Sequence, residues 1–117
     1  MSAYLIYHNP RCRKSRESLQ VLQESGSPFE TKLYLEEGLN RQEIWKLKES
    51  LDLPVLEFMR IKEPEFKELG LSRSSSEEEL VQALEEVPKL LERPIIVDAN
   101  SRAVVGRPVE KTKEFIK

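Results

Sequence analysis

The sequence predicts an α/β fold, a mixed sheet of four strands with a helical insertion between the second and third strands. Three observations predict it: a strand–helix–strand pattern at the start, helical periodicity through the middle, and two short apolar segments near the end. A chain of 117 residues without internal repeats suits one hydrophobic core. We therefore expect a single domain over residues 1–117, with the insertion at 36–94.

The first strand and helix are predicted from a change of pattern. Residues 3–7 are continuously apolar, which is typical of a strand buried on both faces. Small and apolar residues then recur at steps of three and four from Cys12 to Leu22, which predicts a helix. Gly26 and Pro28 are expected to end that helix.

A second strand is predicted over residues 29–35, where apolar and polar side chains alternate. Strand, helix and strand together form a βαβ unit, so the two strands should be parallel. In the insertion, Asn40 and Glu43 resemble a capping box at a helix start. The serines at 74–76 suit either an N-cap or a flexible linker, and the helical pattern that follows favours the cap.

The end of the chain predicts a hairpin and a closing helix. Residues 95–97 form a short apolar strand, 98–101 are turn-like, and 103–105 return as the hairpin partner. Residues 109–117 are expected to close the fold as a helix.

Composition excludes several classes of protein. Apolar residues make up 38% of the chain and charged residues 34%, which is ordinary for a solvated globular protein. A net charge of −2 does not suggest nucleic-acid binding. No apolar run approaches the roughly 20 residues that span a membrane, and the N-terminus does not resemble a secretory signal. We therefore expect a cytoplasmic protein that binds no membrane and no nucleic acid.

The single cysteine, Cys12, is the candidate nucleophile. It stands at the predicted helix start, where unpaired backbone N–H groups and the helix dipole favour a thiolate. The neighbouring cations Arg11, Arg13, Lys14 and Arg16 should strengthen that effect and argue against an inert, buried thiol. With no second cysteine, any redox cycle must take its other thiol from another molecule.

His8 has two open interpretations. It could stabilise the thiolate, or it could be a satisfied polar residue at the end of the first strand. One histidine and one cysteine make no cluster of metal ligands, so no metal is expected. A phosphatase-like Cys-x5-Arg site is excluded, because position 18 is Ser18.

The segment His8-Asn9-Pro10-Arg11-Cys12-Arg13-Lys14-Ser15-Arg16 resembles the signature of the glutaredoxin-coupled arsenate reductase (ArsC) family. The resemblance covers essentially the whole chain in the same order. It includes the later blocks Phe58-Met59-Arg60, Lys67-Glu68-Leu69, Leu91-Glu92-Arg93-Pro94-Ile95 and Gly106-Arg107-Pro108. Arg13 and Lys14 depart from the small residues that many members carry there, and resemble a less characterised branch.

The resemblance implies a thioredoxin-like fold and an assignment of site residues. Cys12 would attack arsenic, with His8 near the sulfur and the Ser15 hydroxyl donating to the thiolate. Without the resemblance, three arginines so far apart in sequence would be interpreted as surface charges. With it, the substrate-binding residues are expected to be Arg60, Arg93, Arg107, Arg16 and Asn9.

The family also implies the partners. Arsenate or a similar oxyanion would be the substrate, glutathione the co-substrate, and glutaredoxin the protein that reduces the resulting mixed disulfide. The lone cysteine fits this scheme, because thioredoxin-coupled reductases need resolving thiols in their own chain. We expect an oxidoreductase of arsenic detoxification that acts as a monomer with no bound cofactor.

Two other functions stay open. A general glutathione-dependent thiol oxidoreductase would share the thiol chemistry and differ only in substrate. The Spx-like regulators resemble the same fold and bind RNA polymerase, but they usually sense oxidation through Cys-x-x-Cys, and here the fourth position is Ser15.

Overall fold

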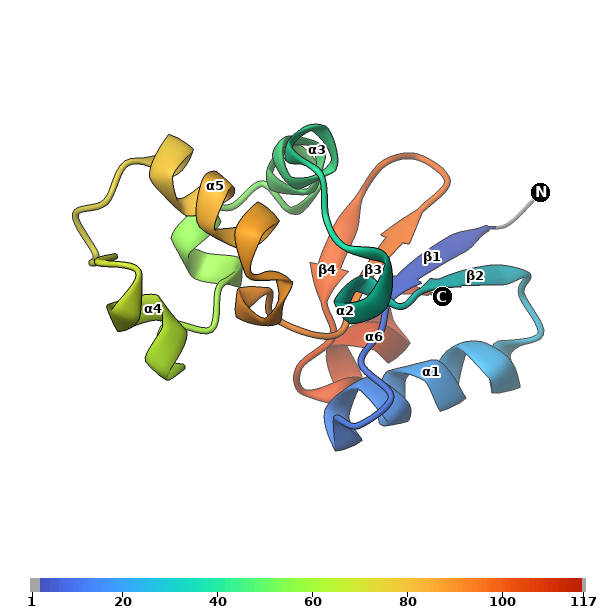
Figure 1. Ribbon diagram of the computed structural model, residues 1–117. Coiled ribbons are helices and arrows are strands. Elements are labelled where there is room, and N and C mark those ends of the chain that lie inside the picture. Colours follow the sequence, from blue (N-terminus) through green and yellow to red (C-terminus); the bar gives the residue numbers. More distant parts are fainter. Residues whose placement is uncertain (1–2, 117) are drawn as a thin grey trace. The chain divides into compact units, whose positions relative to one another are not determined.

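The predicted mixed sheet is present in the computed structural model, which describes residues 3–116 (Figure 1). Its strand order is β2-β1-β3-β4. The central β1 (Tyr4–Tyr7) pairs in parallel with β2 (Phe29–Lys32) and antiparallel with β3 (Ile95–Asp98). β4 (Ala103–Val105) completes the hairpin with β3. The α/β prediction is therefore confirmed, with the parallel β1–β2 pair and the β3–β4 hairpin as expected.

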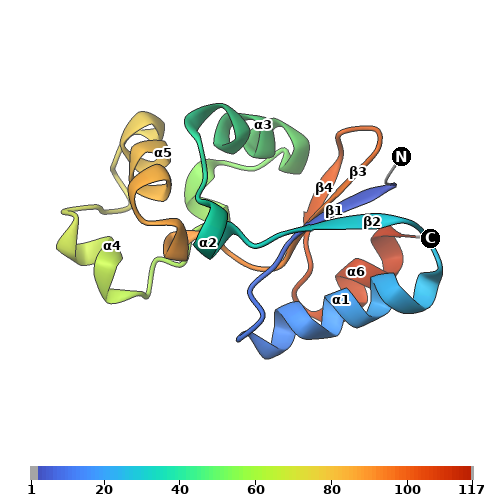
Figure 2. The ribbon, with the colours of Figure 1, turned by 45° about the vertical axis from the view of Figure 1, so that its right-hand side comes forward.

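One face of the sheet packs against two helices, α1 (Arg13–Ser25) and α6 (Val109–Phe115) (Figure 2). Ile6 stands opposite Ile96 in the strand pairing, and both side chains are fully buried with Leu22 of α1. Each such buried side chain stabilises the fold by about 1.5–3 kcal/mol. Of the closing helix predicted over 109–117, the last residue lies outside the described residues.

The second strand is shorter than predicted. It ends at Lys32, and α2 (Tyr34–Glu37) follows where the alternation had suggested more strand. The Leu33 carbonyl accepts the N–H groups of Glu36 and Glu37, and the Leu33 N–H donates to the Glu37 carboxylate at 2.9 Å. These local hydrogen bonds favour a helical turn over further pairing with β1, although apolar and polar residues still alternate along the sequence here.

The helical region contains α3 (Arg41–Leu51), α4 (Pro64–Glu68), α5 (Glu77–Glu86) and the 3-10 turns η1 (Val55–Phe58) and η2 (Pro88–Leu90). Both α3 and α5 begin with a complete capping box, formed by Asn40 with Glu43 and by Ser76 with Glu79. The serine run is therefore a helix start. Fully buried Ile44, Phe58 and Leu84 contribute to the core of this region.

The chain divides into two units. The first comprises the described residues up to Glu37 and from Arg93 onward, and contains the sheet; the second is Gly38–Glu92. The second unit nearly coincides with the predicted insertion at 36–94, while the single-domain organisation stays a prediction. Within residues 3–116, none of the helices combines the length and the apolar character needed to cross a membrane.

Candidate active site

Cys12 lies in the loop between β1 and α1, where it is the N-cap residue of α1. Its backbone is extended (φ −95°, ψ 122°), and its carbonyl accepts the first helical hydrogen bond, from the Arg16 N–H at 3.0 Å. The Cys12 N–H donates to the Asn9 carbonyl at 3.0 Å, which closes a tight turn just before the helix. Cys12 as a residue is partly exposed, so it is not enclosed in the core.

The surroundings of the sulfur favour the thiolate. Burial raises the pKa of the Cys12 thiol, but the backbone N–H groups of Ser15 and Lys14 and the guanidinium of Arg93 outweigh it. The net result is a pKa below that of an ordinary cysteine. The two amides are unpaired N–H groups of the first helical turn, so they donate towards the sulfur at no cost to other hydrogen bonds.

Two arginines from distant parts of the sequence contact the sulfur. Arg93 precedes β3 and hydrogen-bonds Cys12 through its side chain. Arg107 follows β4 and places its Nη1 3.9 Å from the Cys12 Sγ and 3.4 Å from the Arg93 carbonyl oxygen. Both arginines precede a proline through a cis peptide bond, Arg93-Pro94 and Arg107-Pro108.

A buried polar cluster lies beside Gly106 and Arg107, which are together called the Arg107 segment. The Ser18 hydroxyl of α1 is 2.7 Å from the Thr112 hydroxyl of α6, and it donates to the Gly106 carbonyl at 3.4 Å. All three residues are buried. A Cβ on Gly106 would lie 2.8 Å from the Ser18 Oγ and would also collide with the Thr112 Oγ1. Only glycine therefore fits immediately before Arg107.

His8 and Asn9 meet at the Ser15 hydroxyl. The Nδ1 of His8 is 2.6 Å from the Ser15 Oγ, and the Asn9 N–H donates to the same oxygen at 3.0 Å. Burial and the nearby Arg16 lower the pKa of His8, so the imidazole is neutral at pH 7. His8 is therefore connected to the Cys12 loop by its hydrogen bond with Ser15, and its neutral ring adds no positive charge near the thiolate. The catalytic roles of His8 and Ser15 stay predictions.

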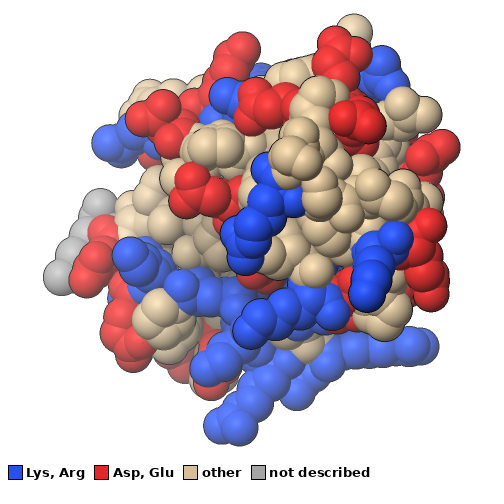
Figure 3. Space-filling model, turned by 90° about the vertical axis from the view of Figure 1, so that its left-hand side faces the viewer, with Lys and Arg blue, Asp and Glu red and all other residues tan. Residues whose placement is uncertain are grey.

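The cations next to Cys12 in sequence are exposed. Arg16 donates from its Nη1 to the Pro10 carbonyl at 3.0 Å, and Arg13 pairs with Glu17 at 3.8 Å. Arg11 and Lys14 are exposed as well. Figure 3 shows basic side chains gathered along the lower edge of one face.

Arg60, the remaining predicted arginine, belongs to the second unit. Its guanidinium forms an ion pair with Glu63 and donates to the Lys89 carbonyl at 3.4 Å. Lys89 in turn bridges Glu63 and Glu65, at 3.6 and 3.0 Å. The acidic partners of Arg60 were not foreseen, although Glu63 three residues along a turn is an ordinary pairing distance.

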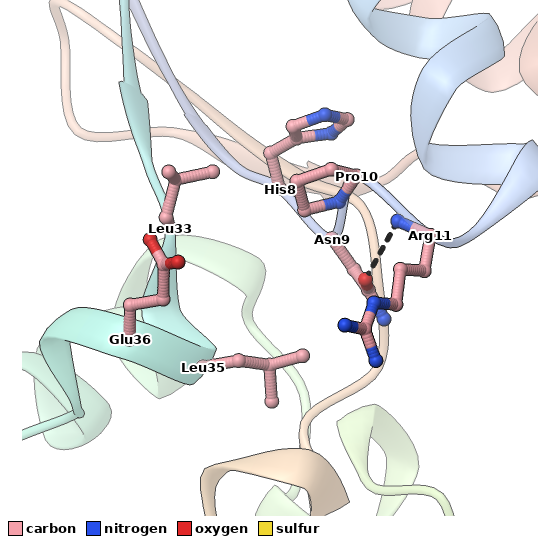
Figure 4. Close-up of a pocket in the computed structure, with 7 residues that line it drawn as sticks. All are labelled: His8, Asn9, Pro10, Arg11, Leu33, Leu35 and Glu36. Atoms are coloured by element: carbon pink, nitrogen blue, oxygen red, sulfur yellow. Dashed lines mark hydrogen bonds between the residues drawn. The ribbon is translucent and has the colours of Figure 1, made fainter.

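A pocket of about 450 Å³ lies beside the Cys12 loop (Figure 4). Residues 8–11 form one wall, and the residues that follow β2, Leu33, Leu35 and Glu36, form the other. None of these three residues was predicted from the sequence to belong to the site. The predicted parallel pairing could have indicated them. The carboxyl ends of parallel strands lie at the same edge of a sheet, so the residues that follow β1 and β2 should be neighbours.

Together these features define the class of protein as a thioredoxin-like α/β protein with one activated thiol. The helix amides, Arg93 and Arg107 favour negative charge on the sulfur and can hold an anion beside it. Among residues 3–116, no three His, Cys, Asp or Glu side chains are grouped so that they could hold a metal ion.

Comparison with known proteins then gives the family. A sequence model of the ArsC family matches residues 7–115. A protein named arsenate reductase from Neisseria meningitidis serogroup B is 41% identical over 113 residues, covering 95% of this chain and 96% of that protein. The uncharacterized protein YfgD of Escherichia coli K12 is 49% identical over 113 residues, covering 95% and 94%. The chain belongs to the ArsC family.

Solved structures agree with this assignment. A structure described as an arsenate reductase from Vibrio cholerae has a TM-score of 0.91 and 41% identity, covering 97% of this chain and 98% of that one. A structure described as a putative arsenate reductase from Yersinia pestis has a TM-score of 0.87 and 39% identity, covering 95% and 98%. These relatives support an oxidoreductase.

Proposed function

We propose that this protein is a cytoplasmic arsenate reductase that uses glutathione as its reductant and is regenerated by glutaredoxin. The observation that carries the proposal is the single thiol at the helix N-cap, contacted by the guanidinium groups of Arg93 and Arg107. Guanidinium groups bind tetrahedral oxyanions in a fixed orientation. The names of relatives, described as arsenate reductases, support arsenate as the oxyanion.

In the first step the Cys12 thiolate attacks the arsenic of arsenate. An As–S bond forms, one As–O bond breaks, and the oxygen leaves as water after protonation. Arsenic remains at oxidation state V in this adduct. Arg107 and Arg93 neutralise charge on the arsenate oxygens, and the amides of Lys14 and Ser15 hold the thiolate before attack.

In the second step the thiol of glutathione attacks the Cys12 sulfur and releases arsenite. The As–S electron pair passes to arsenic, which becomes arsenic(III), and each of the two sulfurs loses one electron as they join. The product is a mixed disulfide between Cys12 and glutathione. A glutaredoxin thiol then takes the glutathionyl group and restores Cys12, which is necessary because this chain has no resolving cysteine.

Arg60 enters the proposal through the family resemblance, as a further ligand of the oxyanion. Its ion pair with Glu63 keeps the guanidinium ordered, and at the same time offsets part of its charge. An oxyanion would therefore compete with Glu63 for Arg60.

The test is arsenite production with arsenate, glutathione and glutaredoxin supplied. We expect turnover by the wild type and none by Cys12→Ser, because a serine hydroxyl is not ionised at pH 7 and cannot form the mixed disulfide. Arg13→Gln, an exposed change beside the nucleophile, is the matched control and should retain turnover. Reduction of glutathionylated substrates without arsenite formation would instead indicate a general thiol oxidoreductase.

A further inference from the structure

We propose that the pocket beside the Cys12 loop binds the γ-glutamyl end of glutathione, the thiol co-substrate. This inference rests on the proposed function in taking glutathione as the reductant. It adds the place where the peptide binds and two residues, Arg11 and Glu36, that recognise its charges.

The pocket has the size and the position for this ligand. Its volume of about 450 Å³ lies within the range of about 300–1,000 Å³ typical of small-molecule sites. Leu33 and Leu35 supply apolar walls, and Leu35 is 45% exposed. A ligand lying against Leu35 would remove that apolar surface from water.

The charges of the pocket favour a zwitterion. The side chains of Arg11 and Glu36 lie on opposite sides of it, with Leu35 between them in the view (Figure 4). The Arg11 N–H donates to the Asn9 side-chain oxygen at 3.0 Å, so the backbone that carries the guanidinium is held in place. The γ-glutamyl group carries one carboxylate and one ammonium, which match Arg11 and Glu36. Arsenate, with negative charge only, would be repelled by Glu36.

The pocket is within reach of the nucleophile. Arg11 precedes Cys12, so their Cα atoms are about 3.8 Å apart. An extended tripeptide spans about 10 Å. A glutathione molecule whose γ-glutamyl end occupies the pocket can therefore bring its central cysteine to the Cys12 sulfur, where the second step of the proposed reaction takes place.

A binding experiment tests the site without arsenate. S-methylglutathione cannot form a disulfide, and its titration into the full-length ¹⁵N-labelled protein should shift the amide signals of His8, Asn9 and Arg11 and of residues 33–36. We expect Arg11→Gln and Glu36→Gln each to weaken binding by about threefold to tenfold, since both charged groups are exposed. Arg13→Gln and Glu30→Gln remove exposed charges outside the pocket and should bind as the wild type does.

A second ligand tests which end is bound. S-methyl-γ-glutamylcysteine, which lacks the glycine, should cause the same shifts, and loss of binding with this ligand would overturn the orientation. Shifts confined to other residues, or unchanged affinity in both pocket variants, would overturn the site.

A kinetic arm links the pocket to the thiol. Cys12 first reacts with 5,5′-dithiobis(2-nitrobenzoate), which leaves 2-nitro-5-thiobenzoate bound to Cys12 as a mixed disulfide and releases a second 2-nitro-5-thiobenzoate. After the excess reagent is removed, a reducing thiol displaces the bound, coloured thiolate and forms a new disulfide with Cys12. Glu36→Gln should slow the reaction with glutathione several-fold and leave the reaction with 2-mercaptoethanol unchanged. Equal slowing with both thiols would contradict the proposal. Because neither arm uses arsenate, a functioning pocket without arsenite production would defeat the proposed function alone.

Discussion

At the scale of single residues, the charge that acts on Cys12 comes from the far end of the chain. Arg93 contacts the sulfur, whereas Arg11, Arg13 and Lys14, its neighbours in sequence, have exposed side chains. The sequence correctly predicted the helix start and its amides, because these are local. From the sequence, the lowering of the pKa of Cys12 was attributed to the neighbouring cations. The contact with Arg93 could not be predicted in this way, because it depends on how the strands pair.

Arg93→Gln should therefore raise the pKa of the Cys12 thiol. The variant removes both the positive charge and the charge-assisted hydrogen bond to the thiolate, while the helix amides remain. The rate of alkylation by iodoacetamide, followed against pH, measures this pKa, and the rate at pH 7 should fall several-fold.

Arg13→Gln is the control for this measurement, because Arg13 is next to Cys12 in sequence but pairs with Glu17 on the surface. An equal effect of the two substitutions would show that the charge acts through general attraction, and would contradict a specific role of Arg93.

His8 provides a second prediction, on pH. Its pKa is lowered by burial and by Arg16 from the ordinary value of 6.5. As the pH falls below 6.5, His8 binds a proton in the unfolded chain but stays neutral in the folded protein. The free energy of unfolding therefore decreases as the pH falls through this range. Above 6.5 both states are neutral and His8 causes no change.

Urea unfolding between pH 5 and 8 measures this decrease, in a Cys12→Ser background that removes the titration of the thiol. The ring-proton signals of His8, the single histidine, give its midpoint directly. In the same background His8→Asn should flatten this part of the pH dependence. A midpoint at or above 6.5 would contradict a buried, neutral imidazole.

At the scale of elements, the close packing of α1 and α6 around Gly106 keeps the Arg107 segment in place. Gly106→Ala should destabilise the protein by about 1–3 kcal/mol, because its Cβ overlaps the Ser18 and Thr112 hydroxyls. It should also raise the pKa of Cys12, since Arg107 would move away from the sulfur. Urea unfolding and alkylation against pH measure the two effects.

A double-mutant cycle separates overlap from other causes. Thr112→Ala removes one of the two hydroxyls that the new Cβ would meet, so the double variant should be more stable than the sum of the two single changes predicts. Strict additivity would mean that the cost of Gly106→Ala arises elsewhere.

The elements also show where sequence patterns are sufficient. The capping box of α3 and the N-cap serine of α5 were predicted from the sequence, because capping is an exchange of hydrogen bonds between residues three apart. The end of β2 was not predicted correctly. Alternation over 29–35 is compatible with strand or with a single helical turn, and the choice depends on where the partner strand β1 ends, at Tyr7. The pocket that Leu35 lines follows from that same strand end.

At the scale of the whole molecule, the sequence predicted the fold because its element order allows few topologies, and the family signature then restricted them to one. A parallel β1–β2 pair and an antiparallel β3–β4 hairpin can share one sheet only if the hairpin joins a free edge, and it joins β1. The helical insertion forms a unit of its own, Gly38–Glu92, because its apolar side chains find partners within it.

Arg60 tests whether that second unit takes part in the proposed reaction. Arg60→Ala should raise KM for arsenate, because a charge assigned to the oxyanion is lost, and should leave alkylation of Cys12 nearly unchanged. Glu63→Gln should lower KM, since the carboxylate that competes for the Arg60 guanidinium is neutralised. Steady-state arsenite production measures both. Arg41→Ala is the matched control, because Arg41 lies in the same unit and pairs with Glu85 at 3.6 Å, and its KM should equal that of the wild type. An unchanged KM in Arg60→Ala would restrict oxyanion binding to Arg93, Arg107 and the start of α1, and would leave the insertion without a part in substrate binding.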